Sequence, residues 1–230
     1  VTAWLIEEHS TPIIAISIIF EGGISQDPYK YKGASKLFAN LLNHGAGRYK
    51  SEKFHQILSE NSIELSASAG LDSIEISMEM PAKNKDMAFY LLKKVIHSPR
   101  FDYKSLAKEK ASTLAALQIE KGKPLSLAYK RFFKLVFNKH PYQQIGSTAA
   151  GVKKTNKMYL NRIRRHRFAQ DNLYISVVGN ITKNELKTKL SKIFDSLPKH
   201  AKLKKIDDIL SDTNEGKDVL RIESAQSAVI

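Results

Sequence analysis

The side chains in this sequence that most readily perform chemistry are its seven histidines, because a neutral imidazole can bind a metal ion or transfer a proton. A zinc site needs three or four convergent ligands, and two histidines on a helix become neighbours when they are three or four residues apart. No histidine here has another at that spacing. We therefore expect turn, loop or helix-surface roles for all of them: His9, His44, His55, His97, His140, His166 and His200.

Nucleophilic and carboxylate chemistry find equally little support. The chain contains no cysteine, which excludes thiol nucleophiles, thiolate zinc sites and disulfides. Glu75 and Glu79 share one face of a predicted strand, but alternating polar positions on a hairpin are usually solvated, so we expect no catalytic pair there. Four serines have no evident His and Asp partners: Ser35, Ser66, Ser68 and Ser77.

Composition indicates a globular protein without a membrane-spanning helix. Hydrophobic residues make up 42% of the chain and charged residues 26%, which is the balance of an ordinary folded domain. The longest apolar run, Ile13–Phe20, is far shorter than the about 20 residues that a membrane helix requires. Residues 1–8 lack the features of a signal peptide, and we expect that a chain beginning at Val1 has been trimmed.

The net charge of +14 would suit acidic partners such as nucleic acid. The lysines, however, are spread over nearly every predicted helix. One dense basic cluster falls on a single predicted helix: Arg162, Arg164, Arg165, His166 and Arg167. We interpret it as a solvated face, because no stacking aromatic platform or nucleic-acid-binding motif accompanies it. Nucleic-acid binding therefore ranks last among the functional hypotheses.

Strands and helices that would position a site can be predicted in the amino-terminal part from hydrophobic periodicity. Strands are predicted over residues 3–7, 13–20, 63–69 and 73–80. Helices are predicted over residues 34–43 and from Ser51 through Leu58. We expect the first two strands to pair with each other, and the other two to form a hairpin around Gly70-Leu71-Asp72.

The rest of the chain is mainly helical. Helices are predicted over residues 84–97, 103–119, 125–137, 156–168 and 183–197. One strand, residues 173–179, is an apolar run that predicts burial on both faces. This order of elements predicts an α+β fold with helices packed on a largely antiparallel sheet.

These patterns divide the chain into three segments. We expect one domain over residues 1–197 and a linker over 198–217, where apolar content falls and Lys, Asp, Asn and Gly rise. Strand character resumes over 218–230. Since a lone strand cannot be a domain, we expect this segment to be the first strand of a truncated second domain.

Several short motifs occur in an order that resembles the insulinase family, which includes pitrilysin and the mitochondrial processing peptidases. The motifs are Phe20-Glu21-Gly22-Gly23, Lys32-Gly33-Ala34, Asn138-Lys139-His140-Pro141-Tyr142, Gly146-Ser147, and Asp171-Asn172-Leu173 through Val178-Gly179-Asn180. Similar stretches of that family are a strand ending in a small-residue turn, the zinc-motif helix, an H-P-Y-G-type loop with a Gly-Thr turn, and a D-N-L strand ending in V-V-G. The shared order over almost the whole chain carries the resemblance.

Active members carry H-x-x-E-H on the first helix, where the two His bind zinc and the Glu activates water. When Gly33 is matched to the glycine before that motif, Lys36, Ala39 and Asn40 stand at the His, Glu and His positions. Lysine offers an ammonium in place of a neutral imidazole, and alanine can neither accept nor donate a proton. His44 lies near these positions, but it is one residue beyond a turn from Asn40.

The family's third zinc ligand is a Glu on a later helix. In this sequence its position falls around Ala115 and Ala116, which cannot ligate. The resemblance therefore implies an α+β, processing-peptidase-like amino-terminal half with no metal, no cofactor and no catalytic residue of its own.

The resemblance implies a non-catalytic subunit of a zinc metallopeptidase, which completes a peptide-binding chamber with an active sister subunit. The implied partners are a zinc-bearing sister peptidase subunit or a second copy of the chain, and unstructured peptides, with no nucleic acid and no membrane span. Zinc is expected in the partner, and a periplasmic or cell-envelope location is favoured. The alternative is a structural or assembly protein of the inactive core type found in respiratory complexes.

Overall fold

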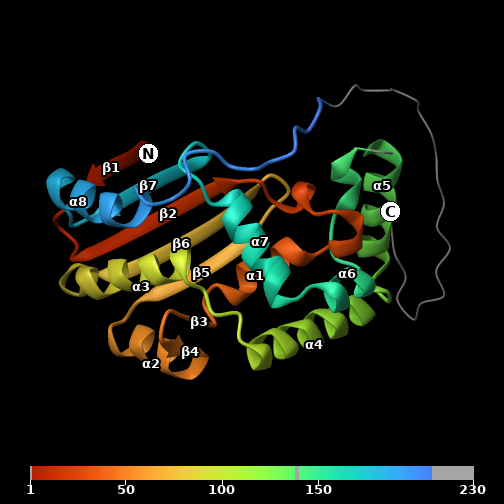
Figure 1. Cartoon of the computed structure of the whole chain (residues 1–230), viewed down its shortest axis with the longest axis horizontal. Coiled ribbons are helices and arrows are strands. Elements are labelled where there is room, and N and C mark those ends of the chain that lie inside the picture. The colour runs from red at the N-terminus through yellow and green to blue at the C-terminus, as the bar shows by residue number, and fades with distance from the viewer. Residues whose placement is uncertain (1, 138–139, 209–230) are drawn as a thin grey trace.

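A five-stranded sheet forms the centre of the molecule, whose computed structural model describes residues 2–137 and 140–208 (Figure 1). The strand order is β1-β7-β2-β6-β5. The strands are β1 (Thr2–Glu7), β2 (Ile13–Glu21), β5 (Glu64–Ala69), β6 (Ser73–Pro81) and β7 (Leu173–Gly179). Only β1 and β7 run parallel, and the other neighbours are antiparallel. The predicted α+β class and the β5–β6 hairpin are confirmed.

The expected pairing of the first two strands is wrong, because β7 lies between them. Ile175 of β7 pairs with Ala3 of β1 on one side and with Ile18 of β2 on the other. A central position satisfies the backbone of β7 on both edges and buries Ile175 completely. Local periodicity identifies strands but says nothing about a strand more than 150 residues away.

Helices cover one face of the sheet (Figure 1). The helices of this layer are α1 (Ala34–Leu41), α3 (Lys85–His97), α7 (Lys157–Arg167) and α8 (Lys183–Phe194). Alternate residues of the strands point into this layer, and the ring of Phe20 stacks on Phe168 with centroids 4.0 Å apart. The edge of the Phe168 ring also meets Phe38 of α1. The main hydrophobic core therefore lies between the sheet and this helix layer.

The opposite face of the sheet is open. β7 alternates between buried and exposed residues, with Tyr174 40% and Val178 44% exposed. Ile13 of β2 is likewise 40% exposed. The prediction that residues 173–179 are buried on both faces is therefore wrong. Its physical reason is that, within the described part of the chain, the helices pack on the other face only.

The remaining elements surround the edge at β5 and the far end of the sheet. They are η1 (Ile24–Gln26), η2 (Tyr29–Tyr31), β3 (Gly45–Ala46), β4 (Tyr49–Lys50), α2 (Ser51–Glu60), η3 (Ala82–Asn84), α4 (Tyr103–Glu120), α5 (Pro124–Phe137), η4 (Pro141–Gln144) and α6 (Ala149–Lys154). The β3–β4 ribbon and α6 were not predicted. No helix among the described residues is long and apolar enough to cross a membrane.

After α8 the chain runs back across the molecule as an irregular segment, residues 199–208, which we call the strap (Figure 1). It is held by backbone contacts, such as the Lys202 N–H donating to the carbonyl of His166. The strap corresponds to the first part of the predicted linker, residues 198–217. Residues 209–217 of that linker and the predicted strand over 218–230 lie outside the described residues.

Candidate functional site

Two of the sequence motifs meet at the start of α1. Gly33 precedes the helix with a φ of +101°, in the left-handed region that favours glycine. A Cβ at this position would lie 2.4 Å from the Oγ of Ser147, so the helix start can approach the Gly146-Ser147 turn only without a side chain. The motif glycine thus fixes where α1 begins, and with it the positions matched to the zinc motif.

The basic cluster meets the Gly22-Gly23 motif at a buried ion pair. Arg167 at the end of α7 is 4% exposed, and its Nη2 lies 2.9 Å from Oδ1 of Asp27. Its Nη1 donates to the carbonyls of Gly22 and Gly23 and to the hydroxyl of Ser35. The prediction that the whole basic cluster forms a solvated face is therefore wrong for Arg167, since a carboxylate and two carbonyls replace its water.

The H-P-Y loop is also structural. Nδ1 of His140 accepts a hydrogen bond from the backbone N–H of Tyr142. The Tyr142 hydroxyl donates to Asp72 over 2.7 Å, and this bond raises the pKa of Tyr142. The loop thereby docks on the turn of the β5–β6 hairpin. Asn138 and Lys139 of the same motif lie outside the described residues.

On α1 the positions matched to the zinc motif do not present ligands to a common point. Lys36 and Asn40 are exposed, one turn apart, and Ala39 is 1% exposed. Nδ2 of Asn40 donates to Oε1 of Glu109 on α4 over 2.7 Å. An amide–carboxylate hydrogen bond therefore joins α1 and α4 here.

Sequence reasoning missed Glu109, although its spacing on α4 could have indicated it. Residues seven apart lie on the same face of a helix, two turns along. Ala116 is seven residues after Glu109, so it shares the face that reaches α1, whereas Ala115 is turned away by about 100°. Both alanines are exposed. That one of them stands at the third-ligand position remains a prediction.

The structure brings His44 and His55 together, which local spacing had not indicated. Their ring centroids are 5.8 Å apart, with the rings nearly perpendicular. Burial lowers the pKa of His44, and the neighbouring His55 lowers it further. Within residues 2–137 and 140–208, no three His, Asp or Glu side chains are placed to hold a metal ion.

Stability should depend on pH through His44. The folded chain binds this proton less readily than the unfolded chain, so the free energy of unfolding should fall as the pH drops through the ordinary histidine range near about 6.5. We expect His44→Gln to lose less stability than the unmodified chain between about pH 7.5 and 5.5. Urea unfolding at both pH values measures this, and equal losses in the two proteins would contradict it.

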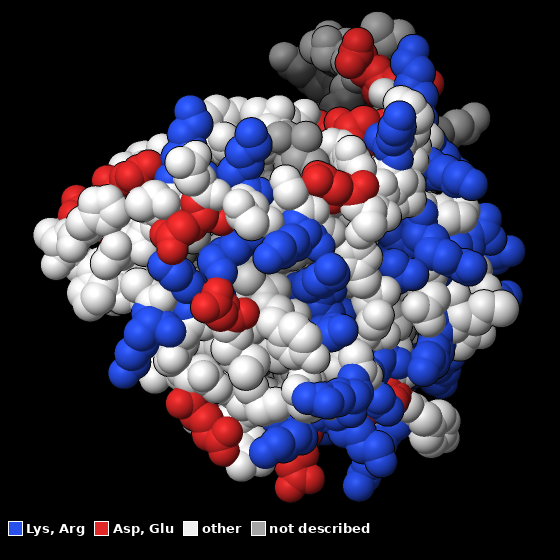
Figure 2. All heavy atoms as spheres, turned by 60° about the vertical axis from the view of Figure 1, so that its left-hand side comes forward, with Lys and Arg blue, Asp and Glu red and all other residues white. Residues whose placement is uncertain are grey.

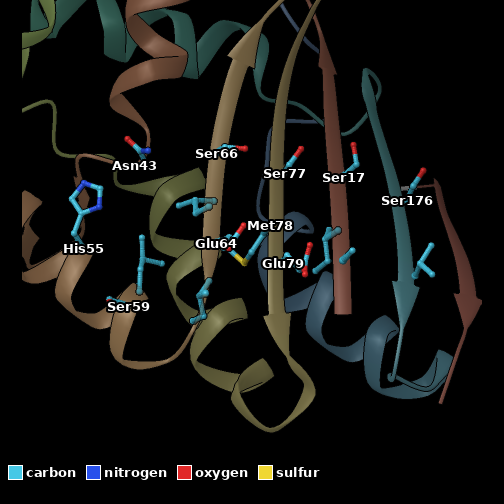
Figure 3. Close-up of a pocket in the computed structure, with 16 residues that line it drawn as sticks. Ser17, Asn43, His55, Ser59, Glu64, Ser66, Ser77, Met78, Glu79 and Ser176 are labelled. Carbon is cyan, nitrogen blue, oxygen red and sulfur yellow. The ribbon is translucent and has the colours of Figure 1, made fainter. Parts of the chain in front are cut away.

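A cavity of about 770 Å³ lies on the open face of the sheet near β5. Its floor includes a row of serines in register across four strands (Figure 3): Ser66, Ser77, Ser17 and Ser176. Glu64 and Glu79 pair opposite each other beside this row. At the rim beyond β5, Asn43 carries a buried Oδ1 without a hydrogen-bond partner among the described residues.

Glu75 on the same open face is held by serines, since it accepts hydrogen bonds from Ser17 over 3.0 Å and from Ser77 over 3.4 Å. β5 ends the sheet, so its outer backbone groups have no strand partner among the described residues. The face therefore combines a cavity, polar side chains and a free strand edge. These features suit an extended polypeptide better than a small rigid ligand.

A mixed sheet with helices on one face and an open second face forms an α+β domain, whose helix α1 carries the positions matched to H-x-x-E-H. Residues 3–144 match the insulinase family, peptidase family M16. The chain belongs to this family, as the order of its motifs had predicted.

Two relatives and one solved structure are similar to the chain. It is 33% identical over 111 residues to a protein of Helicobacter pylori named non-peptidase homolog YmxG, covering 48% of this chain and 26% of that protein. It is 23% identical to an uncharacterized zinc protease of Rickettsia felis, covering 80% and 45%. The solved peptidase M16 inactive domain from Pseudomonas fluorescens superposes with a TM-score of 0.83 at 24% identity, covering 89% and 50%. The chain thus spans half or less of each relative.

Proposed function

We propose that the chain is the amino-terminal half of a non-catalytic M16 subunit, which completes a peptide-binding chamber together with a zinc-bearing sister subunit. The observation that carries this proposal is an altered zinc-motif helix beside an intact open sheet face. Lys36 and Asn40 supply no imidazole, and Asn40 is bound to Glu109 over 2.7 Å. Similarity to proteins named as a non-peptidase homolog and an inactive domain supports the loss of catalysis.

Peptide binding is supported by the edge of the sheet. An extended peptide can add to a free strand through backbone hydrogen bonds, which gives affinity with little sequence selection. β5 offers such an edge, and the cavity of about 770 Å³ beside it has room for side chains of the added strand. The proposal therefore gives the chain a holding role, while the sister subunit supplies zinc and the cleaving chemistry.

Pairing with a sister subunit is supported by an apolar stripe on α5. Five large side chains on this helix are more than half exposed and recur at helical spacing: Leu125, Tyr129, Phe132, Leu135 and Val136. A contiguous apolar surface of this kind is typical of protein–protein contacts. The proposal assigns this stripe to the sister subunit, with the assembly in the periplasm or cell envelope.

The test is peptide cleavage by the full-length protein alone, by an M16 sister protein carrying H-x-x-E-H alone, and by their mixture. We expect no cleavage by the first. The mixture should cleave an unstructured peptide about tenfold or more faster than the sister alone, because a closed chamber holds the peptide in place. Stoichiometric zinc and cleavage in the isolated full-length protein would contradict the proposal.

A substitution on the open face separates peptide holding from subunit assembly. Ser77→Trp places a large ring in the cavity, and we expect the mixture to lose about tenfold in activity because the peptide strand is displaced. Thr188→Trp, on the exposed surface of α8, is the matched control and should leave the activity unchanged.

If the full-length protein instead co-purifies with a membrane or respiratory assembly and never stimulates a peptidase, the assembly alternative is favoured.

A further inference from the structure

The excess of positive charge is spread over the surface, as the face in Figure 2 shows, and several Lys and Arg side chains converge on one cavity. This cavity, of about 390 Å³, lies between η2, α7 and the strap. It is separate from the open sheet face, and no residue lines both cavities. We call it the strap cavity.

Five Lys and Arg side chains line the strap cavity; Arg167 is paired with Asp27, and the other four come from three separate segments. These four are Lys30 of η2, Arg162 of α7, and Lys202 and Lys204 of the strap. Among the described residues, none of these four forms an ion pair with a carboxylate. The nearby carboxylate of Asp27 is buried and is already paired with Arg167. The charge of the cavity is therefore not compensated from within the described chain.

The two strap lysines are held in place by their backbone. The N–H of Lys202 donates to the carbonyl of His166 over 2.6 Å. The side chain of Gln26 bonds both the N–H and the carbonyl of Lys204, at 2.8 and 2.9 Å. Two positive side chains thus project from a fixed segment, so a ligand would not have to order the strap before binding.

One wall of the cavity is aromatic, because the rings of Tyr31 and Tyr159 stack there with centroids 3.7 Å apart. His166 also lines the cavity. Burial lowers the pKa of His166, and the neighbouring positive charges of Arg162 and Lys202 lower it further.

We propose that the strap cavity binds an oligophosphate group. A single phosphate ester carries only about −1.5 to −2 charge at neutral pH, which would leave about half of four cationic charges uncompensated. Two or three linked phosphates match the charge and span several cations at once. Arg162 offers a planar fork for two phosphate oxygens, and the lysines act as point charges around it.

The test is isothermal titration calorimetry of the chain with sodium tripolyphosphate in a low-salt buffer without magnesium. We expect one site per chain. Lys202→Ala combined with Lys204→Ala should weaken binding about tenfold or more, because two of four phosphate-facing charges are lost. The strap is held by backbone and Gln26 contacts that this variant retains, and an unchanged unfolding midpoint verifies the fold.

The matched control removes the same charge elsewhere, by Lys187→Ala combined with Lys192→Ala on the exposed face of α8, and should keep the affinity. ATP titrated in parallel distinguishes a free oligophosphate, which binds equally well, from a nucleotide, which binds more tightly through its base. Either result supports the site. No binding, equal weakening in both double variants, or citrate binding as tightly as tripolyphosphate would overturn it.

Discussion

Replacing Arg167 by alanine is expected to lower the free energy of unfolding by about 3–5 kcal/mol. The substitution leaves the carboxylate of Asp27, whose side chain is 0% exposed, buried without its ion-pair partner. It also removes the donor shared by the carbonyls of Gly22 and Gly23. An uncompensated buried charge costs far more than the ion pair itself contributes.

Urea or thermal unfolding measures this effect, and a neighbouring arginine provides the control. Arg165→Ala lies on the same helix but is exposed, so its effect should stay within about 0.5 kcal/mol. Replacing both partners, by Asp27→Leu and Arg167→Met, should recover much of the stability, because no unpaired charge remains. Equal destabilisation by Arg167→Ala and Arg165→Ala would show that the ion pair has no structural role.

This ion pair also shows why part of the structure could not be predicted from sequence. Arg167 stands in a run of basic residues that looks like a solvated face, and its partner Asp27 is 140 residues away. Helical spacing does separate the two arginines, because Arg167 follows Leu160 by seven residues and Ile163 by four on the buried face of α7, whereas Arg165 lies off that face. What the sequence does not show is that this face packs against the glycine turn after β2, whose carbonyls accept hydrogen bonds from Arg167.

For the same reason, helices and strands could be predicted from the sequence, but the order of the strands in the sheet could not. Periodicity predicted the hairpin of β5 and β6 and most helices nearly to their ends, because each depends on neighbouring residues. It could not predict that β7 inserts between β1 and β2, or that one face of β7 stays open. An apolar residue such as Val178 is compatible with a buried face and also with a surface that another polypeptide covers.

The residues of the candidate site could likewise be predicted only in part. The order of the motifs led to Lys36, Ala39 and Asn40, because motif order is a property of the sequence. Glu109 was missed because the family match pointed to Ala115 and Ala116; its place seven residues before Ala116 was the available signal, but its contact with Asn40 depends on how α4 packs on α1. The His44–His55 contact was missed for the same reason, as the two residues are eleven apart in the chain.

Introducing the family's zinc ligands should create a zinc site on α1, where the described residues hold no group of three metal-ligating side chains. The variant combines three substitutions: Lys36→His, Asn40→His and Ala116→Glu. Positions 36 and 40 are exposed and one turn apart on α1, which is the spacing that lets two imidazoles bind one metal ion. We expect one zinc ion per chain, bound with a dissociation constant of about 1 μM or tighter, whereas the unmodified chain should bind none at this affinity. Equilibrium dialysis with metal analysis measures both.

The position of the third ligand decides whether α4 has been matched correctly. Glu109 already contacts position 40, and position 116 lies on the same helix face about 10.5 Å further along α4, so it is the family match that predicts a carboxylate at 116 beside the two imidazoles. The control carries Ala115→Glu in place of Ala116→Glu and directs the carboxylate about 100° away, which should weaken zinc binding at least about tenfold. If the two variants bind zinc equally well, Ala116 does not occupy the position of the family's third ligand; if neither binds it, Lys36 and Asn40 do not occupy the positions of the two histidines. A tight site in the first variant alone would mean that this chain differs from a zinc peptidase by its side chains rather than by its backbone.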